Sequence, residues 1–335
     1  MTRLLYQLRH NLVLRRNLIQ GGFLFWCLYL GFEFSRFVTH FVSRGQTPRV
    51  ERPPGVEAFL PIGALVSLKN WLLNGIFDPV HPAALVLFLT FIAMALLTRK
   101  SFCSWICPVG TLSEWLWRSQ ERLTGKRFRL WRRADIALRG LKYLLLFFFV
   151  KLILFDMPAP ALKGFLSSPY WALSDVKMLH FFTAPSLLSL IVVLLLAVLS
   201  FFIRQFWCRY LCPYGALLGL FSWPSPCRIT RDPAGCTSCG RCDRACPASL
   251  QVSRSQRVTS PECTACLSCI NTCPEEKVLG MGVSGSRKQL SGWSFTLLVL
   301  AVFASGVVWG MLSGHWHSAL SDRDYLQLIP LLNRF

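Results

Sequence analysis

A cysteine-rich stretch between Cys236 and Pro274 contains the same pattern twice. Residues 236–247 read CTSCGRCDRACP, and residues 263–274 read CTACLSCINTCP. Both tracts have the spacing C-x2-C-x2-C-x3-C-P, so each cysteine and the closing proline recur at the same places. One such tract can arise by chance or belong to a zinc site. Two in tandem with identical spacing indicate one shared chemistry.

This spacing is the one that bacterial two-cluster ferredoxins use to hold [4Fe–4S] clusters. Three cysteines in a tight loop reach three corners of one cluster, and the fourth ligand comes from the other tract. The sequence therefore predicts two sets of four ligands. One set is Cys236, Cys239, Cys242 and Cys273, and the other is Cys263, Cys266, Cys269 and Cys246. We expect Pro247 and Pro274 to turn the chain away from the clusters.

Two other uses of these cysteines fit the spacing less well. Zinc ribbons favour separate C-x2-C pairs over a continuous C-x2-C-x2-C-x3-C run. Disulfides between cysteines this close in sequence would close strained loops. Iron–sulfur ligation also requires reduced thiols, which indicates a reducing compartment around this segment.

The composition excludes an ordinary soluble protein. Of the 335 residues, 53% are hydrophobic and only 16% are charged, which is too apolar for a typical soluble domain. The net charge of +20 does not indicate nucleic-acid binding, because the basic residues lie beside hydrophobic runs, as the positive-inside rule expects. A nucleic-acid-binding protein would gather them on one polar face.

Five apolar runs approach the length of about 20 residues that a membrane helix needs. They are residues 18–42, 82–98, 140–156, 185–203 and 292–312. Glu33 and Arg36 interrupt the first run, but they are three residues apart and can pair on one helix face. The basic segment 1–17 lacks the short apolar core and cleavage site of a signal peptide, so we expect an uncleaved first span.

The charges between the runs predict an orientation. The N-terminal segment carries Arg3, Arg9, Arg15 and Arg16 and no acid. The connection 111–139 is also strongly basic, and only Glu114, Glu121 and Asp135 oppose its basic residues. We therefore expect a bacterial inner-membrane protein whose N-terminus and cysteine tracts are cytoplasmic. Its C-terminal tail after five spans would be periplasmic.

The membrane part contains an internal duplication. Residues 99–110 read RKSFCSWICPVG, residues 204–215 read RQFWCRYLCPYG, and each segment follows an apolar run. Upstream, Pro61, Ala64, Leu65 and Lys69 match Pro169, Ala172, Leu173 and Lys177 at one constant offset. The pattern predicts two parallel two-span repeats. The segments 56–77 and 161–182 would form short interfacial helices at the outer face.

The predicted fold class is an α-helical integral membrane protein of about five spans with an inserted cytoplasmic two-cluster ferredoxin-like α+β domain. The boundaries are residues 18–110 for the first repeat, 140–224 for the second, 225–288 for the ferredoxin-type domain and 289–335 for the last span and tail.

The duplicated C-x3-C-P pairs form a second group of candidate residues, which are Cys103, Cys107, Cys208 and Cys212. Cysteines four apart face one way within a helical turn. Each following proline suits the first turn of a new helix, where the helix dipole favours a thiolate. The four thiols form either an additional redox or metal site, or structural elbows where a span ends.

The segments FCSWICPVGTLSEW and WCRYLCPYGALLGL, together with the two cysteine tracts, resemble the NapH-type and YccM-type membrane ferredoxins and the membrane half of NosR-type proteins. The resemblance covers residues 17 to 312. It implies an inner-membrane protein that moves electrons between the quinone pool and a redox partner, such as a periplasmic reductase or its shuttle. It implies a component of an electron-transfer chain more than a stand-alone enzyme.

Three functions remain open: quinone-linked electron transfer, a maturation factor that reduces metals or thiols through the C-x3-C-P cysteines, and a redox-sensing regulator. A quinol site needs proton acceptors. Candidates near the outer face are Lys69, Lys177, Asp78, His81, Asp175 and His180. Within the spans, Lys151 is a costly charge that either snorkels to the surface or pairs with Glu33.

Overall fold

The computed structural model of the chain describes residues 11–128, 130–285 and 289–330. The chain divides into two compact units. The first, which we call the cysteine-rich unit, contains Met1–Leu24, Phe91–Leu146 and Leu195–Phe303; the second unit contains Phe25–Thr90, Phe147–Leu194 and Ala304–Phe335. Five helices contain a boundary between the units: α2 (Leu12–Val42), α4 (Pro82–Thr98), α7 (Arg132–Val150), α11 (Leu187–Phe202) and α15 (Gly292–Leu312).

In the described part of the chain, α2 and α15 are long and apolar enough to cross a membrane. Two bent helix pairs raise the number of candidate spans to four: Arg133–Asp156 with Ala159–Leu166, bent by 108°, and Ser174–Thr183 with Leu187–Phe202, bent by 75°. The breaks contain Pro158 and Pro185, and proline cannot continue a helix. The remaining expected span, α4, is an apolar helix of 17 residues. The structure thus gives two to four candidate spans where the sequence predicted five.

Large apolar side chains are exposed along these helices. They include Phe25, Leu28 and Phe32 of α2, Leu144 and Phe147 of α7, Leu194 and Val198 of α11, and Val308 and Leu312 of α15. Water-soluble proteins rarely expose apolar surface of this extent. Together with the lengths of the helices, these faces indicate a membrane protein.

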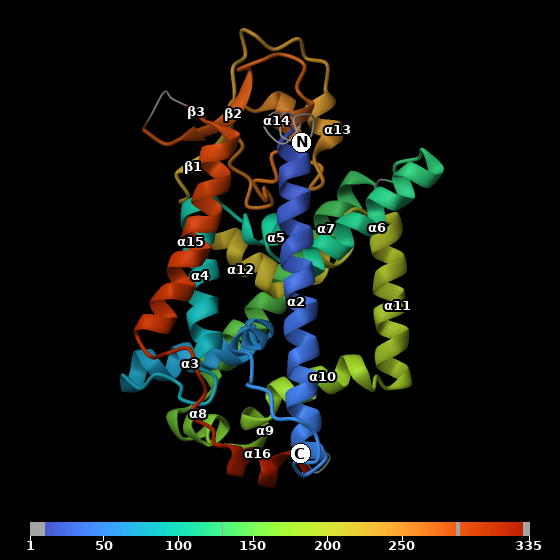
Figure 1. Cartoon of the computed structure of the whole chain (residues 1–335). Coiled ribbons are helices and arrows are strands. Elements are labelled where there is room, and N and C mark those ends of the chain that lie inside the picture. Colours follow the sequence, from blue (N-terminus) through green and yellow to red (C-terminus); the bar gives the residue numbers. More distant parts are fainter. Residues whose placement is uncertain (1–10, 129, 286–288, 331–335) are drawn as a thin grey trace, which may run out of the picture. The chain divides into compact units, whose positions relative to one another are not determined.

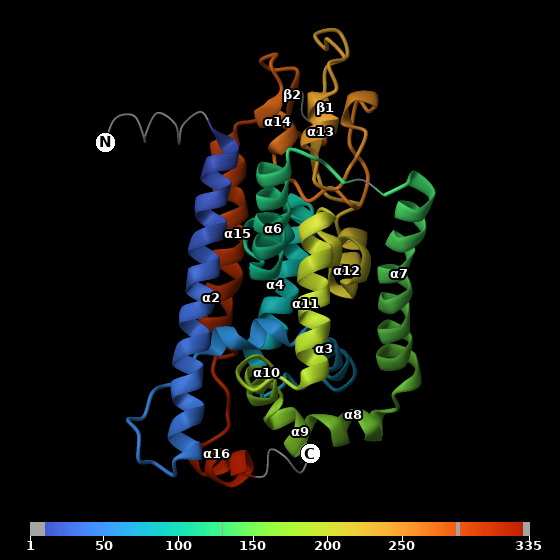
Figure 2. The same cartoon turned by 90° about the vertical axis from the view of Figure 1, so that its right-hand side faces the viewer.

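The cysteine-rich unit contains the α+β insert that the sequence predicted. Its strands β1 (Cys227–Arg231), β2 (Leu279–Val283) and β3 (Gln289–Leu290) form an antiparallel sheet in that order, with Ile229 opposite Met281. The short helices α13 (Arg241–Ala245) and α14 (Ser268–Thr272) of the insert lie side by side (Figures 1 and 2). The same unit holds α5 (Phe102–Trp105), α6 (Pro108–Thr124), the π-helical turn η3 (Trp207–Leu211), α12 (Pro213–Phe221) and the 3₁₀ turn η4 (Val252–Arg254).

The second unit contains the short helices expected in segments 56–77 and 161–182. They are η1 (Pro54–Phe59), α3 (Pro61–Asn74), α8 (Ala159–Leu166), α9 (Pro169–Ala172) and α10 (Ser174–Thr183), and the π-helical turn η2 (Lys151–Asp156) and α16 (Asp322–Leu328) complete the unit. Matching sequence positions have different shapes here. Pro61 and Lys69 share one helix, whereas the helix from Pro169 breaks at Leu173 before Lys177.

The basic connection 111–139 is mostly helical, and its three acids are ion-pair partners. Glu114 pairs with Arg16 and Arg118, Glu121 with Arg127 and Arg204, and Asp135 with Arg139 and Arg209. Arg15 is also buried and lies 3.7 Å above the ring of Trp293. Arginines that count as loop charges in the sequence therefore form contacts that hold the cysteine-rich unit together. Arg3 and Arg9 lie outside the described residues.

The two charges inside predicted spans have local partners. Glu33 pairs with Arg36 at 3.2 Å, as the sequence predicted. Lys151 pairs with Asp156 at 2.7 Å. The Lys151–Glu33 pair is therefore wrong, because each side chain has an opposite charge within reach on its own segment.

Glu114 offers a test of the buried ion pairs. It is 1% exposed and faces Arg16, which is fully buried, and Arg118. The Glu114→Gln substitution leaves both guanidinium groups without a counter-charge, so we expect a loss of about 3 kcal/mol in the free energy of unfolding. Thermal or denaturant unfolding of the purified protein measures it.

The matched control is Asp322→Asn, because Asp322 pairs with Arg49 at an exposed site. An exposed pair contributes about 0–1 kcal/mol. Equal effects of the two substitutions would contradict a structural role for the Glu114 pair.

Candidate iron–sulfur and thiol site

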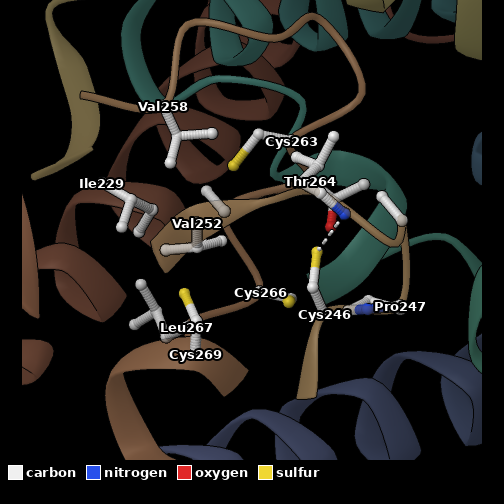
Figure 3. Close-up of a pocket in the computed structure, with 13 residues that line it drawn as sticks. Ile229, Cys246, Pro247, Val252, Val258, Cys263, Thr264, Cys266, Leu267 and Cys269 are labelled. Carbon is white, nitrogen blue, oxygen red and sulfur yellow. Dashed lines mark hydrogen bonds between the residues drawn. The ribbon is translucent and has the colours of Figure 1, made fainter. Parts of the chain in front are cut away.

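The eight tract cysteines line two separate cavities, each with four. One cavity is lined by Cys236, Cys239, Cys242 and Cys273, which we call the solvent-facing set. The other is lined by Cys246, Cys263, Cys266 and Cys269, which we call the buried set (Figure 3). These are the two groups of four that the sequence predicted, and each combines three cysteines of one tract with the last cysteine of the other.

Both tracts have the same unusual backbone conformation. Ser238 and Gly240 have positive φ angles of 56° and 64°, and the equivalent Ala265 and Leu267 have 49° and 58°. A side chain on such a residue costs free energy, and strain of this kind concentrates at functional sites. These left-handed residues curl each loop around its cavity, so that three cysteines face inward from one short segment.

The donor atoms fit an iron–sulfur cluster. Each cavity presents four thiols, and the backbone N–H of Leu250 donates to the sulfur of Cys246 at 3.4 Å. Within the described ranges, no group of three or more His, Cys, Asp or Glu side chains converges closely enough to hold a single metal ion. The four cysteines of each set line a cavity, as the ligands of a four-iron cubane do.

The two sets differ in exposure. The four cysteines of the buried set are each at most 9% exposed. In the solvent-facing set only Cys242 is buried, whereas Cys239 is exposed. Because the potential of a cluster depends on exposure and on hydrogen bonds to sulfur, clusters in these two cavities would have different potentials. The sequence alone did not predict this difference, because the tracts have the same spacing.

The structure also brings the four C-x3-C-P cysteines together. Each of Cys103, Cys107, Cys208 and Cys212 interacts electrostatically with the other three in the interior of the cysteine-rich unit. Cys107 and Cys212 cap the N-termini of α6 and α12, and the following prolines open these helices as predicted. We call these four residues the four-cysteine group.

The expected thiolate character of this group is wrong. Burial raises the pKa of the Cys103 thiol to about 11 and that of Cys107 to about 12. Helix N-terminal amides act in the opposite direction, and Gly215 N–H donates to the sulfur of Cys212 at 3.2 Å. Burial still raises the pKa of Cys212, because the loss of hydration outweighs the stabilisation that a few amides give to the anion.

The elbow that carries Cys103 is fastened to the loop that carries the buried set. The Ser104 hydroxyl donates to the carbonyl oxygen of Thr264 at 2.6 Å, and Trp105 Nε1 donates to that of Ala265 at 3.1 Å. A small cavity lined by Cys103 and Cys208 shares Ala248 and Thr264 with the cavity of the buried set. The four-cysteine group and the buried set are therefore neighbours, and Ala248 and Thr264 form the wall between their cavities.

Sequence reasoning missed the charged residues beside this wall. Glu262 accepts hydrogen bonds from Lys142 Nζ at 2.5 Å and from Tyr143 at 2.9 Å, and Lys100 lies 3.8 Å away. Burial would raise the pKa of Glu262, but the two ammonium groups lower it to about 2. Their positions in the sequence could have indicated them, because Glu262 directly precedes Cys263 and Lys100 precedes Cys103 by three residues.

Comparison with known proteins agrees with this geometry. The family described as "4Fe-4S dicluster domain" matches residues 228–274, which contain both tracts. The family described as "4Fe-4S binding domain" matches residues 80–130 and 185–229, and each match contains one C-x3-C-P pair.

The chain is 42% identical over 90% of its length to the "Putative electron transport protein YccM" of Escherichia coli (strain K12), of which the match covers 86%. The chain belongs to the YccM/NapH family of ferredoxin-type electron transport proteins. It is also 31% identical over 59% of its length to the "Ferredoxin-type protein NapH" of Haemophilus influenzae, of which 66% is covered. A match to the "Regulatory protein NosR" of Pseudomonas aeruginosa, 30% identical, covers 54% of the chain and 25% of that protein. No solved structure matches the chain.

In this member of the YccM/NapH family, half of the predicted outer-face quinol residues form a buried charged cluster in the second unit. Arg52 donates to Asp175 at 2.7 Å and to Glu57 at 2.7 Å, and His81 Nε2 donates to the carbonyl oxygen of Trp171 at 2.8 Å. Trp171 Nε1 in turn donates to Asp78 at 2.9 Å.

The two predicted lysines, Lys69 and Lys177, make different contacts from the residues of this buried cluster. Lys69 donates to the carbonyl oxygens of Ile153 and Met157, and Lys177 lies over the ring of Tyr170. The cluster fills the core of its unit, so its first role is to hold the short helices together.

This cluster predicts a pH dependence of stability. Burial would lower the pKa of His81, but the hydrogen bond and charge of Glu57 raise it above 6.5. A raised pKa stabilises the folded state fully below the unfolded value and loses that contribution as the pH rises through the folded value. We expect the free energy of unfolding to decrease as the pH rises above about 6.5, the usual value for histidine, by about 1.4 kcal/mol for each unit of the shift. The thermal unfolding midpoint, measured as a function of pH, should fall in the same direction.

The comparison that isolates His81 is the His81→Gln variant, which cannot gain a proton. Its stability should change less over the same pH range. An equal pH dependence in both proteins would assign the effect to another group.

Proposed function

We propose that the protein is an electron-transfer component that holds two [4Fe–4S] clusters and connects the quinone pool with a redox partner. The solvent-facing set and the buried set are the ligands, four to each cluster. Each cluster supplies a site that accepts and releases one electron. The acceptor we favour is a periplasmic reductase or its shuttle, and the protein resides in the bacterial inner membrane with its N-terminus cytoplasmic.

The observation that carries this proposal is the order of the thiol groups in the cysteine-rich unit. An exposed cysteine, Cys239, lies in one set, the other set is buried, and the buried set shares Ala248 and Thr264 with the cavity of the four-cysteine group. This spatial order of thiol groups leads from solvent to the ends of the candidate membrane helices. The protein's own contribution is to hold the ligands, exclude water from the buried set and place Lys100 and Lys142 near it.

Serine substitutions test the ligand sets. Cys273→Ser and Cys236→Ser should leave the same cluster in place, because both residues belong to the solvent-facing set although they lie in different tracts. Cys246→Ser and Cys263→Ser should leave the other. Iron content should fall by about half in each of the four variants, because each variant loses one of two clusters of equal size.

Electron paramagnetic resonance of the reduced protein is the measurement. If Cys273→Ser gave the residual spectrum of Cys263→Ser, each tract would hold its own cluster and the crossed ligand sets would be wrong.

The four-cysteine group is tested separately. Serine at Cys103, Cys107, Cys208 or Cys212 should retain both tract clusters and slow electron exchange with quinones by at least about tenfold, or about 1.4 kcal/mol. Cys27→Ser is the control, because Cys27 belongs to the second unit. Loss of iron from these variants while both tract clusters remain would assign a third centre here.

A second function, reduction of a metal or a thiol during maturation of another enzyme, is supported by the four free thiols and the small cavity beside Cys103 and Cys208. It is favoured if the same serine variants exchange electrons with quinones normally but no longer load the target enzyme with its cofactor.

A further inference from the structure

A larger cavity lies on another side of the buried set. Its volume is about 490 Å³, which is in the range of small-molecule sites, about 300–1,000 Å³. It shares Leu250 and Val258 with the cavity of the buried set. A molecule in this cavity would therefore be separated from the buried set by one layer of apolar side chains. We call it the arginine pocket.

One wall of the arginine pocket is a proton-bearing network. Tyr210 donates to Asp135 Oδ1 at 2.5 Å, and Arg209 and Arg139 donate to Asp135 Oδ2 at 2.7 Å and 2.5 Å. The pair of guanidinium groups exceeds the single carboxylate by one positive charge. This wall combines a phenol, a carboxylate and fixed cations around one position.

Two buried donors of this network have no acceptor in the described part of the chain. Arg209 is 8% exposed, and its Nε has no hydrogen-bond partner among the described residues; the same is true of the buried Nε of Arg139. Leaving a buried donor unsatisfied costs about 1–3 kcal/mol. An acceptor oxygen in the pocket would remove this cost.

The other wall is apolar and continues along two helices. Ile136 belongs to the start of α7, Ile203 follows the end of α11, and both line the pocket. Within the same unit, Leu144 of α7 and Leu195 and Val198 of α11 are exposed apolar side chains. Both helices belong to candidate spans. An apolar tail can leave the pocket along them.

We infer that the arginine pocket binds the head group of a lipophilic quinone, with Tyr210, Arg209 and Asp135 around its oxygens and the tail along α7 and α11. This inference rests on the proposed electron-transfer function and assigns its quinone site to the cysteine-rich unit, away from the residues of the second unit that the sequence suggested.

The chemistry balances with the groups present. A quinol that becomes a quinone breaks two O–H bonds and releases two protons and two electrons. Asp135 accepts one proton and water at the open side of the pocket accepts the other. A cluster held by the buried set would accept one electron and pass it to a cluster held by the solvent-facing set before it accepts the second, so that two one-electron centres take up the two electrons. The same balance would hold in reverse.

Binding is tested first, with photoreactive azido derivatives of a benzoquinone and a naphthoquinone on the intact holoprotein. Mass spectrometry should place the label on peptides from residues 130–139, 203–210 and 249–260, which line the pocket. Label confined to other segments overturns the site. Native mass spectrometry provides the competing outcome: an anionic phospholipid that holds the pocket and is not displaced by quinone also overturns it.

Substitutions then separate binding from folding. Tyr210→Phe removes a hydrogen bond to a carboxylate and should weaken quinone binding by about tenfold. Tyr143→Phe is the matched control, because it removes the equivalent bond to Glu262 and lies outside the pocket. Ile203→Trp fills the pocket and should abolish binding. Ser255→Trp, at another residue that lines the pocket, is the replacement if that variant does not fold.

Iron content and reduction by dithionite should be unchanged in these variants. The two hypotheses fail differently. A wild-type protein that is labelled in the pocket but exchanges no electrons with any quinone overturns the proposed function and keeps the site. A wild-type protein that exchanges electrons while Tyr210→Phe and Ile203→Trp bind quinone normally keeps the function and overturns the site.

Discussion

The hydrogen bonds from Ser104 and Trp105 to the carbonyl oxygens of Thr264 and Ala265 are the contact on which the site depends. They join the elbow after α4 to the loop that carries Cys263 and Cys266. Because each links backbone of the cysteine loop to a buried side chain, they fix where the buried set lies relative to the four-cysteine group. Without them, the two thiol groups would be separate features of one chain.

Ion pairs reinforce the same arrangement. Arg16, Arg204 and Arg209 come from distant parts of the sequence, and each meets an acid of the connection between α4 and α7. Buried charges are stable only when they are paired. The pairing therefore restricts how the ends of α2, α11 and α12 can assemble around the cysteine loops, and it explains why a strongly basic chain buries several of its arginines.

The sequence predicted which four cysteines line each of the two cavities, because the spacing within a tract is a local property. The left-handed residues at Ser238, Gly240, Ala265 and Leu267 follow from the same repeated pattern. The sequence also predicted the helix starts at Pro108 and Pro213, because these too depend on a local pattern. It failed for the Lys151–Glu33 pair, because Lys151 has a nearer partner in Asp156. It also failed for the thiol pKa values, because burial reverses the effect expected from helix termini.

By itself, the sequence determined that eight cysteines form two groups of four, that the chain is a membrane protein and that the C-x3-C-P pairs are duplicated. These are consequences of short-range spacing and of composition. Only the tertiary structure decided that one group is exposed and the other buried, that Glu262, Lys100 and Lys142 gather beside the buried one, and that Tyr210, Arg209 and Asp135 form a pocket there. Those features depend on contacts between residues 74 to 120 positions apart, and local sequence patterns contain no information about such contacts.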